Sequence, residues 1–191
     1  MYEFDPATRI VRRGGALGPE AALIALQRQS AAPLRMPIGV IGPREAVGET
    51  LQLAEAAGAV IARCGFTLLC GGRQGVMEAA SRGAATAGGI VVGILPEEDI
   101  GGANAYVTIP IATGIGEARN AIVARACRCL VAVGNSLGTL SEVALALRFG
   151  RAVFGLGGAA QVEGVRHLAG VEDLAAGLAA ELITDRSPGK V

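Results

Sequence analysis

Short apolar runs that alternate with longer segments rich in alanine and leucine constrain the fold of this 191-residue chain most strongly. The runs are continuously apolar, as is typical of strands buried on both faces, and the segments between them are long enough for helices. Strands and helices in alternation produce a parallel sheet covered by helices on both sides. We therefore predict a single α/β domain of Rossmann-like architecture. Strands are predicted at about 38–42, 66–70, 90–95, 106–109, 129–133 and 152–156, and helices at about 45–64, 76–87, 117–126, 139–149 and 171–182.

Residues 1–36 precede this pattern and are predicted to form an N-terminal extension. Tyr2–Arg13 favours a short hairpin, because Asp and Pro in its middle are typical turn residues. Residues 19–29 show the helical spacing of apolar side chains and begin with a proline, which suits the first turn of a helix. We expect this extension to pack at the rim of the main domain, residues 37–186, and to carry no chemistry. Residues 187–191 are predicted to be a tail.

Two glycine-rich turns each follow a predicted strand and lead into a predicted helix; they lie at residues 71–75 and 134–139. Glycine takes positive φ and allows close approach to the backbone, while the following helix presents free N–H groups and the positive end of its dipole. Such turns bind anions, most often phosphate. Because the carboxyl ends of parallel strands meet at one edge of a sheet, we predict that both turns, Gly42 and the charged segment 116–120 form one site.

Composition and missing motifs disfavour several classes of function. The formal net charge of zero and the 3% aromatic content offer neither an electrostatic footprint for nucleic acid nor a stacking platform for bases. No G-x-G-x-x-G motif follows the first predicted strand, which disfavours a nicotinamide dehydrogenase. Cys127 and Cys129 lack a second pair of ligands, and His167 is the only histidine, so we predict no metal site.

The only lysine is Lys190, close to the end of the sequence. No internal lysine is therefore present to form a Schiff base with pyridoxal phosphate, and a lysine decarboxylase is excluded. The apolar runs are too short to span a membrane, and the sequence begins with no apolar segment typical of a secretion signal. The cysteines are expected to be buried, reduced thiols. We therefore expect a cytoplasmic protein that has no membrane partner.

Three stretches resemble the Lonely Guy (LOG) superfamily, whose members were long labelled possible lysine decarboxylases: residues 70–77, Arg119, and Gly138-Thr139-Leu140-Ser141-Glu142. The resemblance covers about residues 38–156. Within the superfamily, the chain is similar to the bacterial branch that is grouped with molybdenum-cofactor carrier proteins. It implies a Rossmann-like fold, a homodimer and a bound nucleoside monophosphate. The best-known members cleave the N-glycosidic bond of cytokinin riboside monophosphates or of AMP. Their catalytic pair maps onto Arg119 and Glu142.

The glycine motifs depart from the family pattern in two places. Cys70 stands where the family has the first glycine of GGGxxGLM, and Gly134-Asn135-Ser136 stands where it has Pro-Gly-Gly. Asparagine tolerates left-handed φ, whereas serine does so poorly. Ser136 either adds a hydroxyl donor for an anion or narrows its approach. The changed motif favours a protein that binds without turnover, whereas the pair of Arg119 and Glu142 favours an enzyme.

Two functions are therefore predicted as alternatives. One is a nucleoside 5′-monophosphate phosphoribohydrolase, which yields free base and ribose 5-phosphate and requires no cofactor. The other is a carrier or sensor that binds molybdenum cofactor or another phosphorylated pterin or nucleotide. By spacing alone, Glu142 is also typical of a first-turn glutamate stabilised by the helix dipole. The partners are then a small phosphorylated molecule and a second copy of the chain. Binding is predicted to involve Gly42, Gly71, Gly72, Arg73, Gly75, Met77, Gly134, Asn135, Ser136, Gly138 and Thr139.

Overall fold

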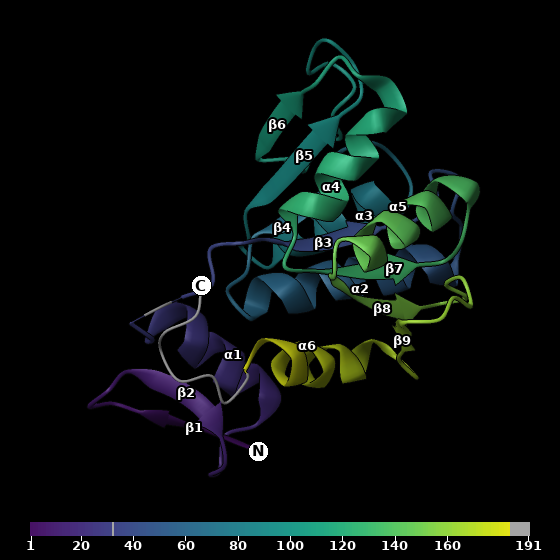
Figure 1. Cartoon of the computed structure of the whole chain (residues 1–191). Coiled ribbons are helices and arrows are strands. Elements are labelled where there is room, and N and C mark those ends of the chain that lie inside the picture. The colour runs from purple at the N-terminus through teal and green to yellow at the C-terminus, as the bar shows by residue number, and fades with distance from the viewer. Residues whose placement is uncertain (32, 184–191) are drawn as a thin grey trace.

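The computed structural model describes residues 1–31 and 33–183, which contain a seven-stranded sheet (Figure 1). All neighbouring strands of this sheet are parallel, in the order β6-β5-β4-β3-β7-β8-β9. The strands are β3 (Ile38–Ile41), β4 (Leu68–Cys70), β5 (Val91–Leu95), β6 (Ile109–Ala112), β7 (Cys129–Val133), β8 (Ala152–Leu156) and β9 (Val165–His167).

Helices cover both faces of this sheet, and each face has its own hydrophobic core. Successive residues of a strand contribute to opposite cores: in β4, Leu68 and Cys70 belong to one and Leu69 to the other. The predicted α/β, Rossmann-like fold is therefore confirmed. One face carries α2 (Glu49–Arg63), α3 (Val76–Thr86) and α6 (Leu174–Leu182), and the other carries α4 (Asn120–Ala126) and α5 (Leu137–Arg148).

The order of the strands places a topological switch point beside β3. From β3 the chain proceeds outward through β4, β5 and β6, and it then returns to β7 on the other side of β3. Because the connections on the two sides of a switch point diverge, a crevice forms beyond the carboxyl ends of the central strands. The turns after β3, β4 and β7 all lie at this edge, where ligands of such sheets bind.

Helices α2 and α3 pack in unusually close contact, which fixes the start of α3. Gly58 of α2 lies against the carbonyl group of Ala80, and Gly83 of α3 lies against the carbonyl group of Glu55. A Cβ atom at either glycine would collide with that oxygen, so the absence of a side chain is what permits the close approach. The glycine turn that precedes α3 is therefore supported by a rigid pair of helices.

The N-terminal segment forms the hairpin β1 (Tyr2–Asp5) and β2 (Ile10–Arg13), followed by α1 (Pro19–Arg28). Figure 1 shows this segment beside α6, away from α4 and α5. Leu23 of α1 joins the core on the α2–α3–α6 face, and Arg13 Nη2 donates to the carbonyl oxygen of Ala180 at 3.0 Å. The extension thus packs against the C-terminal end of α6, at the end of the domain opposite to the switch point.

Two strands differ most from the sequence-based prediction. The strand predicted at 106–109 lies instead at Ile109–Ala112, because Asn104 holds residues 104–107 in a turn: its Oδ1 accepts from the Tyr106 amide and its carbonyl accepts from the Val107 amide. The short strand β9 was not predicted, since it has only three residues and no fully buried side chain. Residues 184–191, which include the predicted tail, lie outside the described residues. Within the described ranges, no helix has both the length and the apolar character needed to cross a bilayer.

Candidate functional site

A cavity of about 130 Å³ lies at the carboxyl ends of β3, β4 and β7. It is enclosed by the turns that follow these strands and by the short 3₁₀ helix Gly116–Arg119 that leads into α4. The three stretches that the sequence joined into one site are thus brought together around one cavity. Its lining residues are Gly42, Arg44, Arg73, Met77, Glu117, Arg119, Asn120, Ser136, Gly138, Thr139 and Glu142.

Five residues of the predicted binding set are absent from this lining: Gly71, Gly72, Gly75, Gly134 and Asn135. The four glycines among them determine the path of the backbone in the two turns. Gly72 and Gly75 take φ of 74° and 72°, and Gly134 takes φ of 69°, which lies in the left-handed region that favours glycine. A Cβ atom at Gly75 would also collide with the carbonyl group of Arg44. Their effect on a ligand is therefore exerted through the shape of the backbone.

Gly71 meets a different requirement, because its φ is not positive. A Cβ atom built at this position would stand 2.6 Å from Arg119 Nη2 and 2.7 Å from Met77 Sδ. The absence of a side chain at Gly71 therefore creates the space in which the guanidinium group of Arg119 lies. The first glycine turn and the predicted catalytic arginine are thus in direct contact, although they are far apart in the sequence.

Asn104 connects the loop after β5 to the same glycine turn, and sequence reasoning did not identify it. Its Nδ2 donates to the carbonyl oxygens of Gly72, at 3.1 Å, and of Arg73, at 2.9 Å, and its backbone amide also donates to Gly72 at 2.8 Å. From the same loop, Glu97 pairs with Arg73 at 3.0 Å. No sequence motif marks these contacts, because they depend on the path of an irregular loop.

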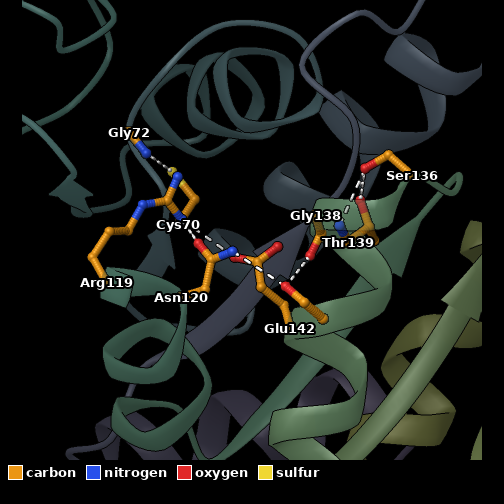
Figure 2. Close-up of polar contacts among 9 residues, drawn as sticks. Cys70, Gly72, Arg119, Asn120, Ser136, Gly138, Thr139 and Glu142 are labelled. Carbon is orange, nitrogen blue, oxygen red and sulfur yellow. Dashed lines mark hydrogen bonds and ion pairs between the residues drawn. The ribbon is translucent and has the colours of Figure 1, made fainter. Parts of the chain in front are cut away.

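Arg119, Asn120 and Glu142 form a buried polar cluster at the centre of the site (Figure 2). Nη1 of Arg119 donates to Asn120 Oδ1 at 2.6 Å and to Glu142 Oε1 at 3.3 Å. Asn120 Nδ2 in turn donates to Ser141 Oγ at 3.4 Å, which links the start of α4 to the first turns of α5. Arg119 Nε is buried and has no hydrogen-bond partner among the described residues. Asn120, which carried no predicted role, therefore orients the arginine.

Burial raises the pKa of Glu142 from its ordinary value of 4.5 to about 7. Desolvation is the main cause, and the charge of Arg119 opposes it, while the nearby carboxylate of Glu117 raises the pKa further. A carboxyl group whose pKa lies near neutrality is able to exchange a proton at physiological pH. The cavity thus contains one acid whose charge depends on pH close to 7.

The N-terminus of α5 reaches the cavity at Ser136, Gly138 and Thr139. Ser136 is the N-cap of this helix: its Oγ accepts from the Thr139 amide at 3.1 Å and lies 2.9 Å from Thr139 Oγ1. Ser136 takes φ of −158°, which any residue adopts, and Gly134 alone in this turn takes positive φ. The change from Pro-Gly-Gly therefore introduces no backbone strain.

Arg44 and Glu117 also line the cavity; Glu117 belongs to the charged segment that was predicted to join the site, whereas Arg44 was not predicted. The only sequence signals for a place in the site were that Arg44 follows a predicted strand and that Glu117 lies close to Arg119 in the chain. The cysteines offer no nucleophile: Cys64, Cys70, Cys127 and Cys129 are buried, and desolvation raises the pKa of Cys64 and Cys129 to about 12. Within residues 1–31 and 33–183, no group of His, Cys, Asp and Glu side chains is arranged to hold a metal ion.

A cavity at the switch point of a parallel sheet, lined by arginines and by a helix N-terminus, is typical of Rossmann-like proteins that bind a small anionic ligand. Residues 35–183 match the SLOG cluster4 family, so the chain belongs to this family of LOG-like proteins. The molybdenum cofactor binding protein of Rippkaea orientalis is 37% identical, with a TM-score of 0.72 over 77% of this chain and 98% of its own.

Two further relatives cover similar parts of the chain. The molybdenum cofactor carrier protein of Chlamydomonas reinhardtii is 39% identical, with a TM-score of 0.71 over 78% of this chain and 99% of its own. An uncharacterised protein of Archaeoglobus fulgidus is 44% identical over 132 residues, which are 69% of this chain and 86% of that protein. Each of these relatives matches more than two thirds of the chain, and together with the family match they support a ligand-binding protein of LOG-like fold.

Proposed function

We propose that this protein binds a phosphorylated pterin of the molybdenum-cofactor class in the cavity and carries it without chemical change. The observation that carries this proposal is the convergence of Arg44, Arg73 and Arg119 on a cavity that also receives the N-terminus of α5. Such a combination favours a phosphate group. The pterin is suggested by the relatives from Rippkaea orientalis and Chlamydomonas reinhardtii, which are described as a binding protein and a carrier protein for that cofactor.

The charge and the size of the cavity fit part of such a ligand. Its two acids are Glu117 and Glu142, and the second is only partly ionised at neutral pH because its pKa is raised to about 7. The three arginines therefore outnumber the acids that line the cavity, although one of them, Arg73, is also paired with Glu97 at 3.0 Å. The volume of about 130 Å³ is smaller than the ~300 Å³ at which drug-sized sites begin. The phosphate and its nearest atoms enter, and the larger ring system of the ligand remains at the mouth.

Production of the protein in bacteria supplied with molybdate tests this proposal. Purified protein should contain molybdenum, measured by mass spectrometry, together with a fluorescent oxidised pterin. Arg119→Ala should lose most of both, because a buried charge-assisted contact is removed. Arg166→Ala is the matched control, since this arginine lies on β9 with its side chain 56% exposed. Protein that copurifies with neither molybdenum nor pterin, and binds neither on addition, would contradict the proposal.

A second candidate function is hydrolysis of a nucleoside 5′-monophosphate, and the contact between Arg119 and Glu142 favours it. In this reaction the bond between C1′ of the ribose and the base nitrogen breaks, water supplies hydroxide to C1′, and the base receives a proton. Positive charge develops on the ribose, which an ionised Glu142 would stabilise. Arg119 would hold the phosphate or the leaving group.

Release of free base from AMP and other monophosphates distinguishes the two candidates. If the protein is an enzyme, Glu142→Gln should lower turnover on the order of a hundredfold with little change in affinity, because it removes the negative charge and keeps the shape. Arg119→Ala should weaken binding as well. Wild-type protein that binds a monophosphate and releases no base leaves only the carrier function.

A further inference from the structure

The side chain of the N-cap residue, Ser136, uses one of the free N–H groups in the first turn of α5. The Oγ atom of Ser136 accepts the Thr139 amide at 3.1 Å, and the carbonyl oxygen of Ser136 accepts the Leu140 amide at 2.8 Å. Figure 2 shows the side chains of Ser136 and Thr139 together at this end of the helix. In the first turn of α5, the N–H groups of Leu137 and Gly138 have no partner among the described residues.

The hydroxyl groups of Ser136 and Thr139 lie 2.9 Å apart, and either oxygen is able to donate to the other. Whichever donates, one of the two hydroxyl protons is used within the pair and the other remains. Among the residues that line the cavity at this end of α5, Gly138 thus offers its amide to an anion, and Ser136 and Thr139 together offer one hydroxyl. Without the Ser136 hydroxyl, the Thr139 amide and the Thr139 hydroxyl would both be available, so the same residues would offer one donor more.

A second feature of the cavity indicates that an anion belongs here. Arg119 is only 5% exposed and lines the same cavity, yet its Nε has no hydrogen-bond partner among the described residues. A buried donor without a partner is unfavourable, and the cavity beside it is lined by three arginines, Arg44, Arg73 and Arg119, which favour an anion. The cationic side chain and the helix N-terminus thus line the same cavity.

We propose that Ser136 is the residue that limits the affinity of this site for phosphate, because its hydroxyl occupies the Thr139 amide in place of the ligand. The inference rests on the proposed function insofar as a phosphate is taken to bind at α5. LOG proteins have Pro-Gly-Gly where this chain has Gly134-Asn135-Ser136. The serine therefore leaves this site with one donor fewer for its ligand than a turn without the hydroxyl would have. For a protein that must release its cargo, weaker retention of the phosphate is an advantage.

Substitutions at Ser136 should change affinity in opposite directions. Ser136→Gly releases the Thr139 amide and hydroxyl, so affinity for AMP and for inorganic phosphate, measured by titration calorimetry, should rise on the order of tenfold. Glycine is also tolerated at an N-cap, so the helix persists. Ser136→Asp keeps a cap but places a carboxylate where the anion would bind. Its affinity should fall on the order of tenfold or more, while its melting temperature is maintained or raised.

Thr8→Ala is the matched control, because its hydroxyl also closes a local turn, by donating to Asp5 Oδ2 at 2.7 Å, but in the N-terminal hairpin. It should leave the affinity for both probes unchanged. Suppose that wild-type protein binds the probes and that Arg119→Ala does not. Affinity in Ser136→Gly that is equal to or lower than that of wild-type protein would then overturn this inference and leave the proposed function intact. If neither wild-type protein nor Ser136→Gly bound AMP, inorganic phosphate or the pterin, this inference and the proposed function would both be overturned.

Discussion

Nη1 of Arg119 lies 3.3 Å from Oε1 of Glu142, and the two side chains are only 6% and 8% exposed. Removing both charges from water is costly, and their attraction offsets this cost only in part, so a buried pair is weak evidence for a stabilising role. The arginine belongs to the 3₁₀ helix that leads into α4, whereas the glutamate belongs to α5. The pair therefore spans the cavity wall between two elements, which is the arrangement expected of groups placed for a ligand.

The ionisation of Glu142 should make stability depend on pH. Its pKa in the folded protein is about 7, above the ordinary value of 4.5, so the folded state binds the proton more tightly than the unfolded chain. The resulting stability is fully present below pH 4.5 and is lost as pH rises through 7. Glu142→Gln lacks this dependence. The stability of wild-type protein relative to Glu142→Gln, from urea unfolding, should fall by up to about 3 kcal/mol over this window.

The opposite dependence of stability on pH would contradict the raised pKa of Glu142. If attraction to Arg119 outweighed desolvation, the folded pKa would be depressed, and wild-type protein would gain stability over Glu142→Gln as pH rises. A constant difference between the two proteins from pH 4 to 8 would show that the carboxyl group titrates alike in both states.

The sequence allowed the fold to be predicted because its signals are local. A continuously apolar run such as Cys129–Val133 predicts a buried parallel strand, and the structure has that strand with the same bounds. Boundaries were less accurate where loops decide them. The helix predicted from residue 45 begins at Glu49, because residues 43–48 form the loop after β3, in which Gly48 takes φ of 57°.

The candidate site was predictable only in part. Glycine turns after strands mark the edge of the sheet, so the neighbourhood of Gly71 and Ser136 follows from topology. Spacing alone did not join Arg119 to Glu142; the resemblance to LOG proteins did. Arg44 and Asn104 were missed because their contacts depend on tertiary packing of irregular loops, for which a single sequence contains no periodic signal.

Gly58→Ala should strongly destabilise the fold. A methyl group at this position would collide with the carbonyl group of Ala80, so α2 and α3 would have to separate along their contact. We expect a loss of about 3 kcal/mol, since overpacking against rigid backbone costs that order of free energy. Urea unfolding measures it. Gly18→Ala is the control, because nothing lies within 4 Å of its added Cβ. A loss as small as that of the control would mean that the helices shift freely.

We predict a homodimer that forms through the face carrying α4 and α5. Ile122 of α4 is 40% exposed, and Ile109 and Ile111 of β6 are 47% and 43% exposed. The register pairs these two isoleucines with Val92 and Ile94, whose side chains pack in the core on the α4–α5 face. The three exposed isoleucines therefore lie on one side of the sheet, where apolar surface needs cover.

Light scattering at micromolar concentration checks the predicted dimer. Ile122→Arg should give a monomer, since a buried unpaired charge opposes association. Ile10→Arg should remain a dimer, because Ile10 is an exposed residue of the distant hairpin. A monomeric wild-type protein, or dissociation caused equally by both substitutions, would count against this interface.

Gly71→Ala should disable ligand binding while the domain remains folded. The φ of Gly71 is not positive, so alanine fits the backbone, but its Cβ would stand 2.6 Å from Arg119 Nη2 and 2.7 Å from Met77 Sδ. Both atoms lie near the ends of flexible side chains, and they move more readily than backbone does. The guanidinium group would therefore leave its position against the glycine turn and lose its alignment with Asn120 and Glu142.

We expect the affinity of Gly71→Ala for its ligand to fall on the order of tenfold or more, as when a charge-assisted contact is lost, with a stability loss of about 1–3 kcal/mol. Calorimetry and urea unfolding measure these two effects. Gly177→Ala is the matched control: its Cβ would stand 3.0 Å from Phe154 Cε1, so it overpacks the core on α6, away from the cavity. The control should lose stability and keep its affinity. Equal affinity in Gly71→Ala and wild-type protein would mean that the position of Arg119 does not govern binding.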